Sequence, residues 1–304
     1  MAVYIHLFDT VAEYEETRAN NYVEPWVSYT EETSGISFNK TEYEKLLGTP
    51  LTFNIISSGT IYWKTQNTAY TTTIEYSKDN GENWTGITST TGGTSFNVNA
   101  GDKVMFRGDN VAYGSDGVDR NNHFSGSTAV FEAEGNIMSL INSTGFATET
   151  TLSSAYTFYY LFNSCTGLTS AEKLILPATT LANYCYQQMF AGCTSLTTAP
   201  SLPATTLVYG CYNRMFYGCT SLTTAPELPA TTLVGSCYRN MFSGCSNLNY
   251  IKCLATNISA SNCTGNWVTG VASTGTFVKP SLTDWSSKTG TNGIPSNWTV
   301  QDVS

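Results

Sequence analysis

The stretch "MFAGCTSLTTAPSLPATTL" (189–207) decides the fold, because it returns as "MFYGCTSLTTAPELPATTL" (215–233), 26 residues further on. Phe162, Phe190, Phe216 and Phe242 begin four related units, and the first interval is two residues longer than the others. A fixed period in this range is typical of proteins in which each unit stacks on its neighbours. We therefore expect a short stack of repeats in the second half of the chain.

Each unit contains an apolar pattern followed by an extended stretch. "CYQQMFAGC" (185–193) places its Cys, Tyr, Met and Phe residues at i, i+1, i+4, i+5 and i+8, as on one face of a helix. The same pattern recurs at 211–219 and 237–245. Proline prevents helix in the Thr-rich sequence that follows. The pattern predicts helices over these three segments and short parallel strands near 196–199 and 222–225.

The copies differ mainly outside the apolar pattern, on the side of each predicted helix that would face solvent. Two interpretations stay open: neutral drift at an unconstrained surface, or an adaptable contact surface. The candidate binding residues on this face are Tyr184, Gln187, Gln188, Tyr209, Asn213, Arg214, Tyr217, Arg239 and Asn240.

All nine cysteines belong to the repeat region, between Cys165 and Cys263. Their spacing along and between predicted helices exceeds the reach of a disulfide, so buried free thiols are the default. A pair between Cys253 and Cys263 stays open as the less favoured alternative. The spacing also differs from that of zinc ligands, and the region has no histidine. We expect no metal and no cofactor.

Residues 49–136 alternate apolar and polar side chains in short runs separated by turn residues. This pattern predicts an antiparallel β-sandwich of Ig-like type. "SKDNGENW" (77–84) is similar to the Asp-box hairpin of sialidases, with Asn83 in place of Thr, and a single copy predicts a structural hairpin. The segment with Asp109, Asp116 and Asp119 is either a calcium loop or, as we favour, a plain polar loop. The strand-like runs are "LTFNIIS", "GTIYWKT", "TTTIEYS", "TSFNVNA", "DKVMFRG" and "TAVFEAEG".

The two ends of the chain have different compositions. Residues 1–48 are acidic and aromatic, and "NKTEYEKLLG" (39–48) predicts a short helix that Asn39 caps and Gly48 ends. Trp285 and Trp298 lie among turn residues that we expect to fold back over the end of the repeats; a carbohydrate-stacking role for them is the minority interpretation. We expect a multidomain protein that is mainly β, with α/β repeats. Its expected domains are an arm (1–48), the sandwich (49–137), the repeats (138–262) and a cap (263–304).

"MFAGCTSL", "MFYGCTSL" and "MFSGCSNL" resemble the BspA-like leucine-rich repeats of Bacteroides and related organisms. That family implies a repeat stack used for recognition and adhesion. "FDTVAEYEETR…YVEPWVSYTEETSGISFNK" resembles the N-terminal segment of virion structural proteins of gut Bacteroides phages, including crAss-like phages. That resemblance implies an arm that docks to the particle. The candidate docking residues are Phe8, Tyr14, Tyr22, Trp26 and Tyr29.

Composition narrows the function. The formal charge of −9 and a pI near 4.7 argue against a nucleic-acid partner, and no apolar run is long enough to enter a membrane. The sequence shows no recognisable catalytic triad, paired carboxylates or phosphate-binding loop, so we expect a non-enzyme.

The leading hypothesis is a phage virion protein: a head fibre, decoration protein or tail fibre. It would assemble in the bacterial cytoplasm, bind other capsid or tail proteins, form a homodimer or homotrimer, and contact host-surface polysaccharide or protein. The alternatives are a BspA-type surface adhesin, which would need export although the N-terminus shows no secretory signal, and a carbohydrate-binding accessory protein.

Overall fold

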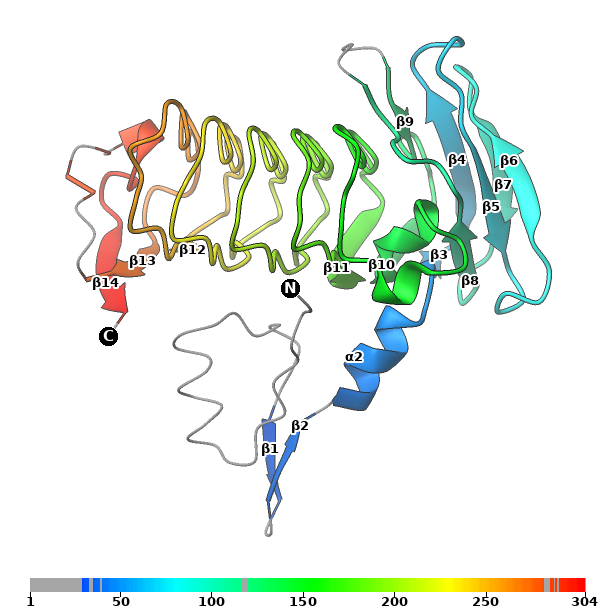
Figure 1. The fold of residues 1–304 in the computed structure, drawn as a ribbon, viewed down its shortest axis with the longest axis horizontal. Coiled ribbons are helices and arrows are strands. Elements are labelled where there is room, and N and C mark those ends of the chain that lie inside the picture. Colours follow the sequence, from blue (N-terminus) through cyan, green and yellow to red (C-terminus); the bar gives the residue numbers. More distant parts are fainter. Residues whose placement is uncertain are drawn as a thin grey trace.

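The protein is mainly β, as predicted, with packed sheets at one end and a stack of coils leading away from them (Figure 1). The computed structural model describes residues 29–32, 35–38, 40–115, 120–281, 285–286, 288 and 290–303. Figure 1 shows the coils as successive layers between the sheets and the C-terminal strands.

Each run that was predicted as a strand in residues 49–136 contains a strand, and these strands form two sheets. One sheet has the order β11-β10-β3-β8-β5-β6, in which β11 is Leu168–Ile175, and the other has the order β7-β4-β9. The short strands β6 and β9 were not predicted, because four and two residues are too few to show alternation. The bounds are β3 (Leu51–Ser57), β4 (Gly59–Thr65), β5 (Thr73–Ser77), β6 (Thr85–Thr88), β7 (Thr94–Val98), β8 (Lys103–Arg107), β9 (Asn122–His123) and β10 (Val130–Asn136).

Aromatic side chains fill the space between the two sheets. Phe53 of β3 stacks on Phe131 of β10 with ring centroids 4.3 Å apart. Phe124 lies 5.0 Å from Phe53 and 4.8 Å from Trp63 of β4, so it joins the two sheets. All four rings are fully buried. The alternation in the sequence therefore marks the residues that pack between the sheets.

The sheets continue directly into the coil stack. β10 pairs with β3 on one side and, in parallel, with β11 (Leu168–Ile175) of the first coil on the other. Two short 3-10 helices, η1 (Ile137–Leu140) and η2 (Phe146–Thr148), lead from β10 into that coil. The apolar residues of both parts belong to one contiguous core. Sheet and core thus pass from the sandwich to the repeats without a break.

The expected helices at 185–193, 211–219 and 237–245 are wrong. Each of these segments lies almost wholly within a turn run, a stretch in which β-turns overlap, and the five turn runs are 155–164, 183–192, 209–218, 235–244 and 261–270. Alternate amides donate to the next coil; those of Gln188 and Phe190, for example, donate to the carbonyl oxygens of Asn213 and Met215, both at 2.9 Å. Five such hydrogen bonds of 2.7–3.2 Å join each neighbouring pair of turn runs. The amides between them donate three residues back along the chain.

The backbone angles explain why a helix does not form. Every fourth residue has a positive φ, as at Tyr184 (59°), Gln188 (55°) and Gly192 (76°), and a right-handed helix excludes such angles. The apolar residues repeat every four positions, whereas four residues of an α-helix overshoot a full turn by about 40°. Over nine residues this difference is too small to reveal itself in the sequence. The predicted apolar residues do point inward: Cys185, Met189 and their equivalents are fully buried.

The expected strands near 196–199 and 222–225 shrink to single parallel bridges, Ser170↔Thr198 and Thr224↔Tyr250. Pro200 and Pro226 follow these bridges and have no amide to extend a ladder. Longer pairing occurs only at the two ends of the stack, in β11 and in β12 (Tyr250–Lys252).

The C-terminal segment continues the parallel pairing at the far end of the stack. Repeat-like hydrogen bonding extends past residue 262, since the amides of Tyr238 and Phe242 donate to the carbonyl oxygens of Cys263 and Trp267. β13 (Thr276–Pro280) and β14 (Thr299–Val303) then continue the parallel sheet from β12, and η3 (Gly290–Asn292) lies between them in sequence. Trp285 and Trp298 are only 2% and 6% exposed, so the carbohydrate-stacking role considered for them is wrong.

The predicted N-terminal helix is present as α2 (Lys40–Leu47), and it packs on the body of the protein. Tyr43 and Leu46 contact Ile175 of β11, and Glu42 forms an ion pair with Lys173. β1 (Tyr29–Glu32) and β2 (Gly35–Phe38) pair as an antiparallel hairpin before α2. Of the candidate docking residues, Phe8, Tyr14, Tyr22 and Trp26 lie outside the described residues, and Tyr29 begins β1.

All nine cysteines are buried free thiols, including Cys253 and Cys263, which confirms the default expectation. Burial raises the pKa of the Cys193 thiol to about 12. Its Sγ donates to the carbonyl oxygen of Phe162 in the preceding coil at 3.0 Å, and Cys219 and Cys245 make the equivalent contact. The thiols therefore act as small core groups that also join neighbouring coils.

Candidate functional site

The turn runs bring most of the predicted contact residues to the surface. Arg214 and Arg239 are exposed, and Tyr209 and Tyr217 are 48% and 47% exposed. Asn213 contradicts the expectation, because it is only 8% exposed. It occupies the position equivalent to Gln187 and Arg239 in the coils on either side, and its shorter side chain does not extend past theirs. The remaining four candidates, Tyr184, Gln187, Gln188 and Asn240, are half-buried.

Three of these coils carry tyrosines that contact one another, and we call Tyr156, Tyr184 and Tyr209 the tyrosine row. The rings of Tyr156 and Tyr184 stack with centroids 4.9 Å apart and an interplanar angle of 14°. Tyr209 meets Tyr184 edge-on at 5.4 Å and 83°. The sequence analysis missed Tyr156, although it lies 28 residues before Tyr184, which is the interval between the first two units.

Glycines in the following coils make room for two of these rings. A Cβ at Gly210 would lie 2.5 Å from Cδ1 of Tyr184, and one at Gly235 would lie 3.0 Å from the ring of Tyr209. Each ring therefore leans across the next coil, where a larger residue would displace it. Burial, together with the neighbouring tyrosines, raises the pKa of Tyr184, so its phenol stays protonated and can hydrogen bond. The three rings are therefore held in place by one another and by the neighbouring coils.

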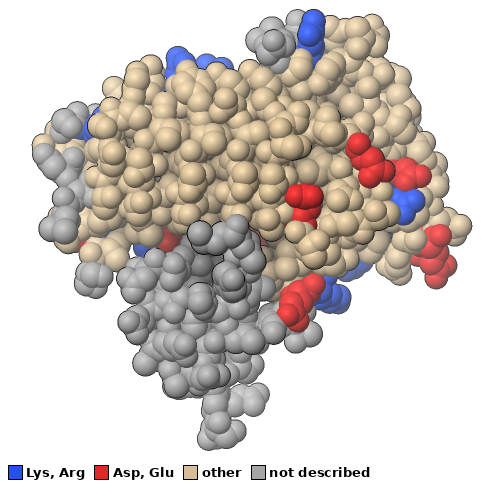
Figure 2. Space-filling view, in the orientation of Figure 1, with Lys and Arg blue, Asp and Glu red and all other residues tan. Residues whose placement is uncertain are grey.

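The sequence on both sides of Tyr184 and Tyr209 carries no charge. No Asp, Glu, Lys or Arg occurs between Lys173 and Arg214, a stretch that contains Tyr184 and Tyr209. Figure 2 shows that the visible face of the coil stack is nearly free of charged side chains. Asn183 and Thr205, which belong to the uncharged stretch of sequence, are exposed. The surface thus combines aromatic rings with neutral hydrogen-bonding groups.

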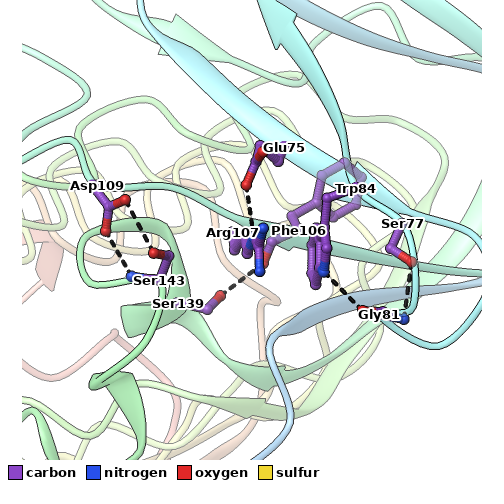
Figure 3. Close-up of polar contacts among 9 residues, drawn as sticks. All are labelled: Glu75, Ser77, Gly81, Trp84, Phe106, Arg107, Asp109, Ser139 and Ser143. Atoms are coloured by element: carbon purple, nitrogen blue, oxygen red, sulfur yellow. Dashed lines mark hydrogen bonds and ion pairs between the residues drawn. The ribbon is translucent and has the colours of Figure 1, made fainter.

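The Asp-box-like segment forms a closed structural hairpin between β5 and β6, as predicted (Figure 3). Ser77 Oγ accepts from the amide of Gly81 at 2.9 Å, and the Trp84 indole donates to the carbonyl oxygen of Gly81 at 2.9 Å. Hydrogen bonds from the Asn83 amide, Ser77 and the Asn83 side chain lower the pKa of Asp79 to about 2. Its carboxylate is thus engaged in holding the turn.

Arg107 of β8 covers this hairpin from the side. Its guanidinium lies 4.1 Å from the ring centroid of Trp84, and its Nε is 2.7 Å from Oε2 of Glu75 on β5 (Figure 3). A cation on an aromatic face, together with an ion pair, joins β8 to β5 and to the turn that holds Trp84. Arg107 and Glu75 therefore have a structural role at this hairpin.

A hollow of about 260 Å³ lies where the sandwich meets the first coil. Asp109 is at its edge, but both carboxylate oxygens accept hydrogen bonds from Ser143, one from the amide at 2.8 Å and one from Oγ at 3.0 Å (Figure 3). The proposed calcium partners Asp116 and Asp119 lie outside the described residues. The hollow is lined by Asp109, Val111, Ile141, Asn142, Glu149, Thr151 and Ser153.

Within the described ranges, no group of three or more His, Cys, Asp or Glu side chains could hold a metal ion. His123 is buried; its Nδ1 is 2.6 Å from Ser125 Oγ, while its Nε2 has no hydrogen-bond partner among the residues that the structure describes. No helix in the part of the chain that the structure describes is both long and apolar enough to span a bilayer. The chain matches no family model, no curated protein and no solved structure.

Proposed function

We propose that this chain is a non-catalytic virion structural protein, a head fibre, decoration protein or tail fibre. Its N-terminal segment anchors it, an Ig-like sandwich acts as a spacer, and a BspA-like leucine-rich repeat stack contacts the host surface. The observation that carries the recognition role is the tyrosine row, an ordered set of aromatic side chains on an uncharged face.

The coil stack is suited to presenting a surface. Five backbone hydrogen bonds join each neighbouring pair of turn runs, and one core extends through the stack into the sandwich. Such a body holds surface side chains in a fixed geometry, which lowers the entropy that binding costs. Tyrosine is enriched at binding surfaces because one end of its side chain is apolar and the other is polar.

The virion setting is supported by sequence alone, through the resemblance of the first forty residues to phage virion proteins. Phe8, Tyr14, Tyr22, Trp26 and Tyr29 remain the proposed docking residues, with capsid or tail proteins as partners. A homodimer or homotrimer would multiply weak surface contacts into avidity.

Immunogold electron microscopy of the source culture, with antibody to residues 138–304, tests the virion assignment. We expect label on phage particles, and its position separates a head fibre from a tail fibre. Label on cell envelopes with bare particles would contradict the proposal and favour the BspA-type adhesin.

Deletion of residues 1–28 tests the anchor separately. We expect particle binding to be lost while the melting temperature stays unchanged. The deletion stops before α2, because Tyr43 and Leu46 pack against Ile175 and their removal would uncover part of β11. Particle binding that survives the deletion would contradict the anchoring role.

A further inference from the structure

We infer that β14 pairs edge to edge with β14 of a second copy of the chain, in antiparallel orientation, and so joins two coil stacks into a dimer. The inference deepens the proposed function, on whose homo-oligomer it rests, by assigning the surface through which the copies meet. That surface lies at the end of the stack that is far from the sandwich (Figure 1).

The outer edge of β14 is open. β14 is the last strand in the order β12-β13-β14, and no strand in the described part of the chain pairs with its other side. The amide of Thr299 donates to the carbonyl oxygen of Gly275, next to β13, at 2.8 Å. Because backbone groups alternate in direction along a strand, those of Val300 and Asp302 point away from β13. These groups are available to another strand.

This edge lacks the features that protect most exposed strands, which are a lysine, a proline, a bulge or a covering loop. Residues 299–303 read "TVQDV", and the register between β13 and β14 runs without a shift. Residues 299–302 are exposed. The one charged side chain, Asp302, already forms an ion pair with Lys279 inside the sheet, at 2.7 Å. β14 can therefore accept a partner strand.

The turn side of the last coil is closed, in contrast to the strand side. The amides of Asn266 and Val268, which are equivalent to donors in the preceding turn run, donate to Asn292 Oδ1 at 2.7 Å and to the carbonyl oxygen of Thr291 at 3.4 Å. The cap thus satisfies the turn run and leaves the hydrogen bonding of the strands unfinished.

An apolar row across the same sheet also ends unfinished. Ile251, Phe277 and Val300 are neighbours in the register of β12, β13 and β14. Ile251 and Phe277 are fully buried, whereas Val300 is 44% exposed. A further strand beside β14 would cover Val300, and removing this apolar surface from water favours association.

A second copy fits this edge because the strand is complementary to itself. With a twofold axis at Gln301, Val300 faces Asp302 of the second copy, and the two such pairs make about four backbone hydrogen bonds. An axis at Asp302 would instead set two carboxylates directly opposite each other. A contact of five residues is small, so we expect a dissociation constant of about 1–100 μM.

Cysteine cross-linking of the full chain tests this register. Gln301→Cys would face itself across the axis, where opposed Cα atoms lie about 4.5 Å apart, within the reach of a disulfide. We expect copper–phenanthroline in air to produce a covalent dimer that reductant reverses. Thr299→Cys is the matched control, since Thr299 is also exposed but faces Val303 of the second copy. The native cysteines are all buried and give little background.

Sedimentation equilibrium measures the association itself. Wild type should form a dimer, and Val300→Lys should weaken it at least about tenfold, because it adds an edge lysine to each copy. Ile56→Lys is the control, since Ile56 on β3 is 49% exposed and should leave the dimer unchanged. A monomer at all concentrations, a trimer, a dimer that Val300→Lys leaves intact, or stronger cross-linking of Thr299→Cys than of Gln301→Cys would each overturn the inference.

Particle labelling separates this inference from the proposed function. Labelled particles together with a chain that stays monomeric in solution overturn the β14 interface alone. A β14 dimer with bare particles overturns the virion assignment and keeps the interface.

Discussion

Phe162→Ala probes the junction between the sandwich and the coil stack. The ring is fully buried, with its centroid 6.0 Å from Phe53 and 5.8 Å from Phe124 in the sandwich, and 5.3 Å from Phe190 in the next coil. Truncating a buried phenylalanine to alanine costs about 3–5 kcal/mol through lost burial and the cavity that remains. Because three aromatic neighbours lose a partner at once, we expect a fall of about 4–5 kcal/mol in the free energy of unfolding.

Hydrogen exchange in increasing urea, followed by mass spectrometry, measures the opening free energy of each segment and so shows which segments the substitution destabilises. The informative peptides are β4 (59–65) and the last turn run (261–270), at opposite ends of the core. Because β10 pairs with both β3 and β11, we expect wild type to open as one unit and Phe162→Ala to lower the protection of both peptides together.

The reasoning would be refuted if only the 261–270 peptide lost protection while β4 kept its wild-type value, because sandwich and coils would then be separate cooperative units. A cost below about 1 kcal/mol would also refute it, since the ring would then not be packed as described. Tyr217→Ala serves as the control, because its half-exposed ring lies outside the core and should cost less than about 0.5 kcal/mol.

Three further predictions concern the turn runs, the thiols and the buried histidine. Gly218→Ala should lower the free energy of unfolding by about 1–2 kcal/mol in urea denaturation, because a φ of 71° strains alanine while the nearest atoms to the new Cβ are 4.0 Å away; no change would disprove the positive-φ argument. Cys193, whose pKa burial raises to about 12, should react with iodoacetamide at pH 8 only as fast as the chain unfolds; prompt labelling of the native protein would contradict this. Burial, together with the charge of Lys64, lowers the pKa of His123 from 6.5 to about 4. Between these two pH values the histidine is protonated in the unfolded chain but mostly neutral in the folded chain. The free energy of unfolding should therefore fall by about 3 kcal/mol between pH 6.5 and 4, and His123→Gln should flatten that part of the profile; the same slope in both proteins would count against the prediction.

The longer strands of the sandwich were predictable because successive side chains of a strand point to opposite faces of the sheet, so apolar and polar residues alternate along the sequence. "LTFNIIS" and "GTIYWKT" show this alternation over seven residues, and both form strands with those bounds. β9 was not predictable, since its two residues pair with β4 only because the chain returns there. Strand length thus separates the elements found from those missed.

The contact surface was only partly predictable. Variation between copies pointed to Tyr184 and Tyr209, which are in the tyrosine row, but also to Asn213, which is buried. Tyr156 could have been found by aligning the first coil with the second at their interval of 28 residues. Tyr209 reaches Tyr184 although it lies one position before the equivalent residue, Gly210, and such a contact depends on how one coil sits on the next.

The sequence by itself determined the repeat, its period and the residues that point into the core. A period of 26 residues and recurring Cys, Met and Phe are properties of the chain, and burial follows from their chemistry. Only the tertiary structure decided that these segments are turn runs and not helices. A nine-residue pattern fits either geometry, and the choice is made by backbone amides such as that of Phe190, which find their acceptors in the neighbouring coil and not within their own segment.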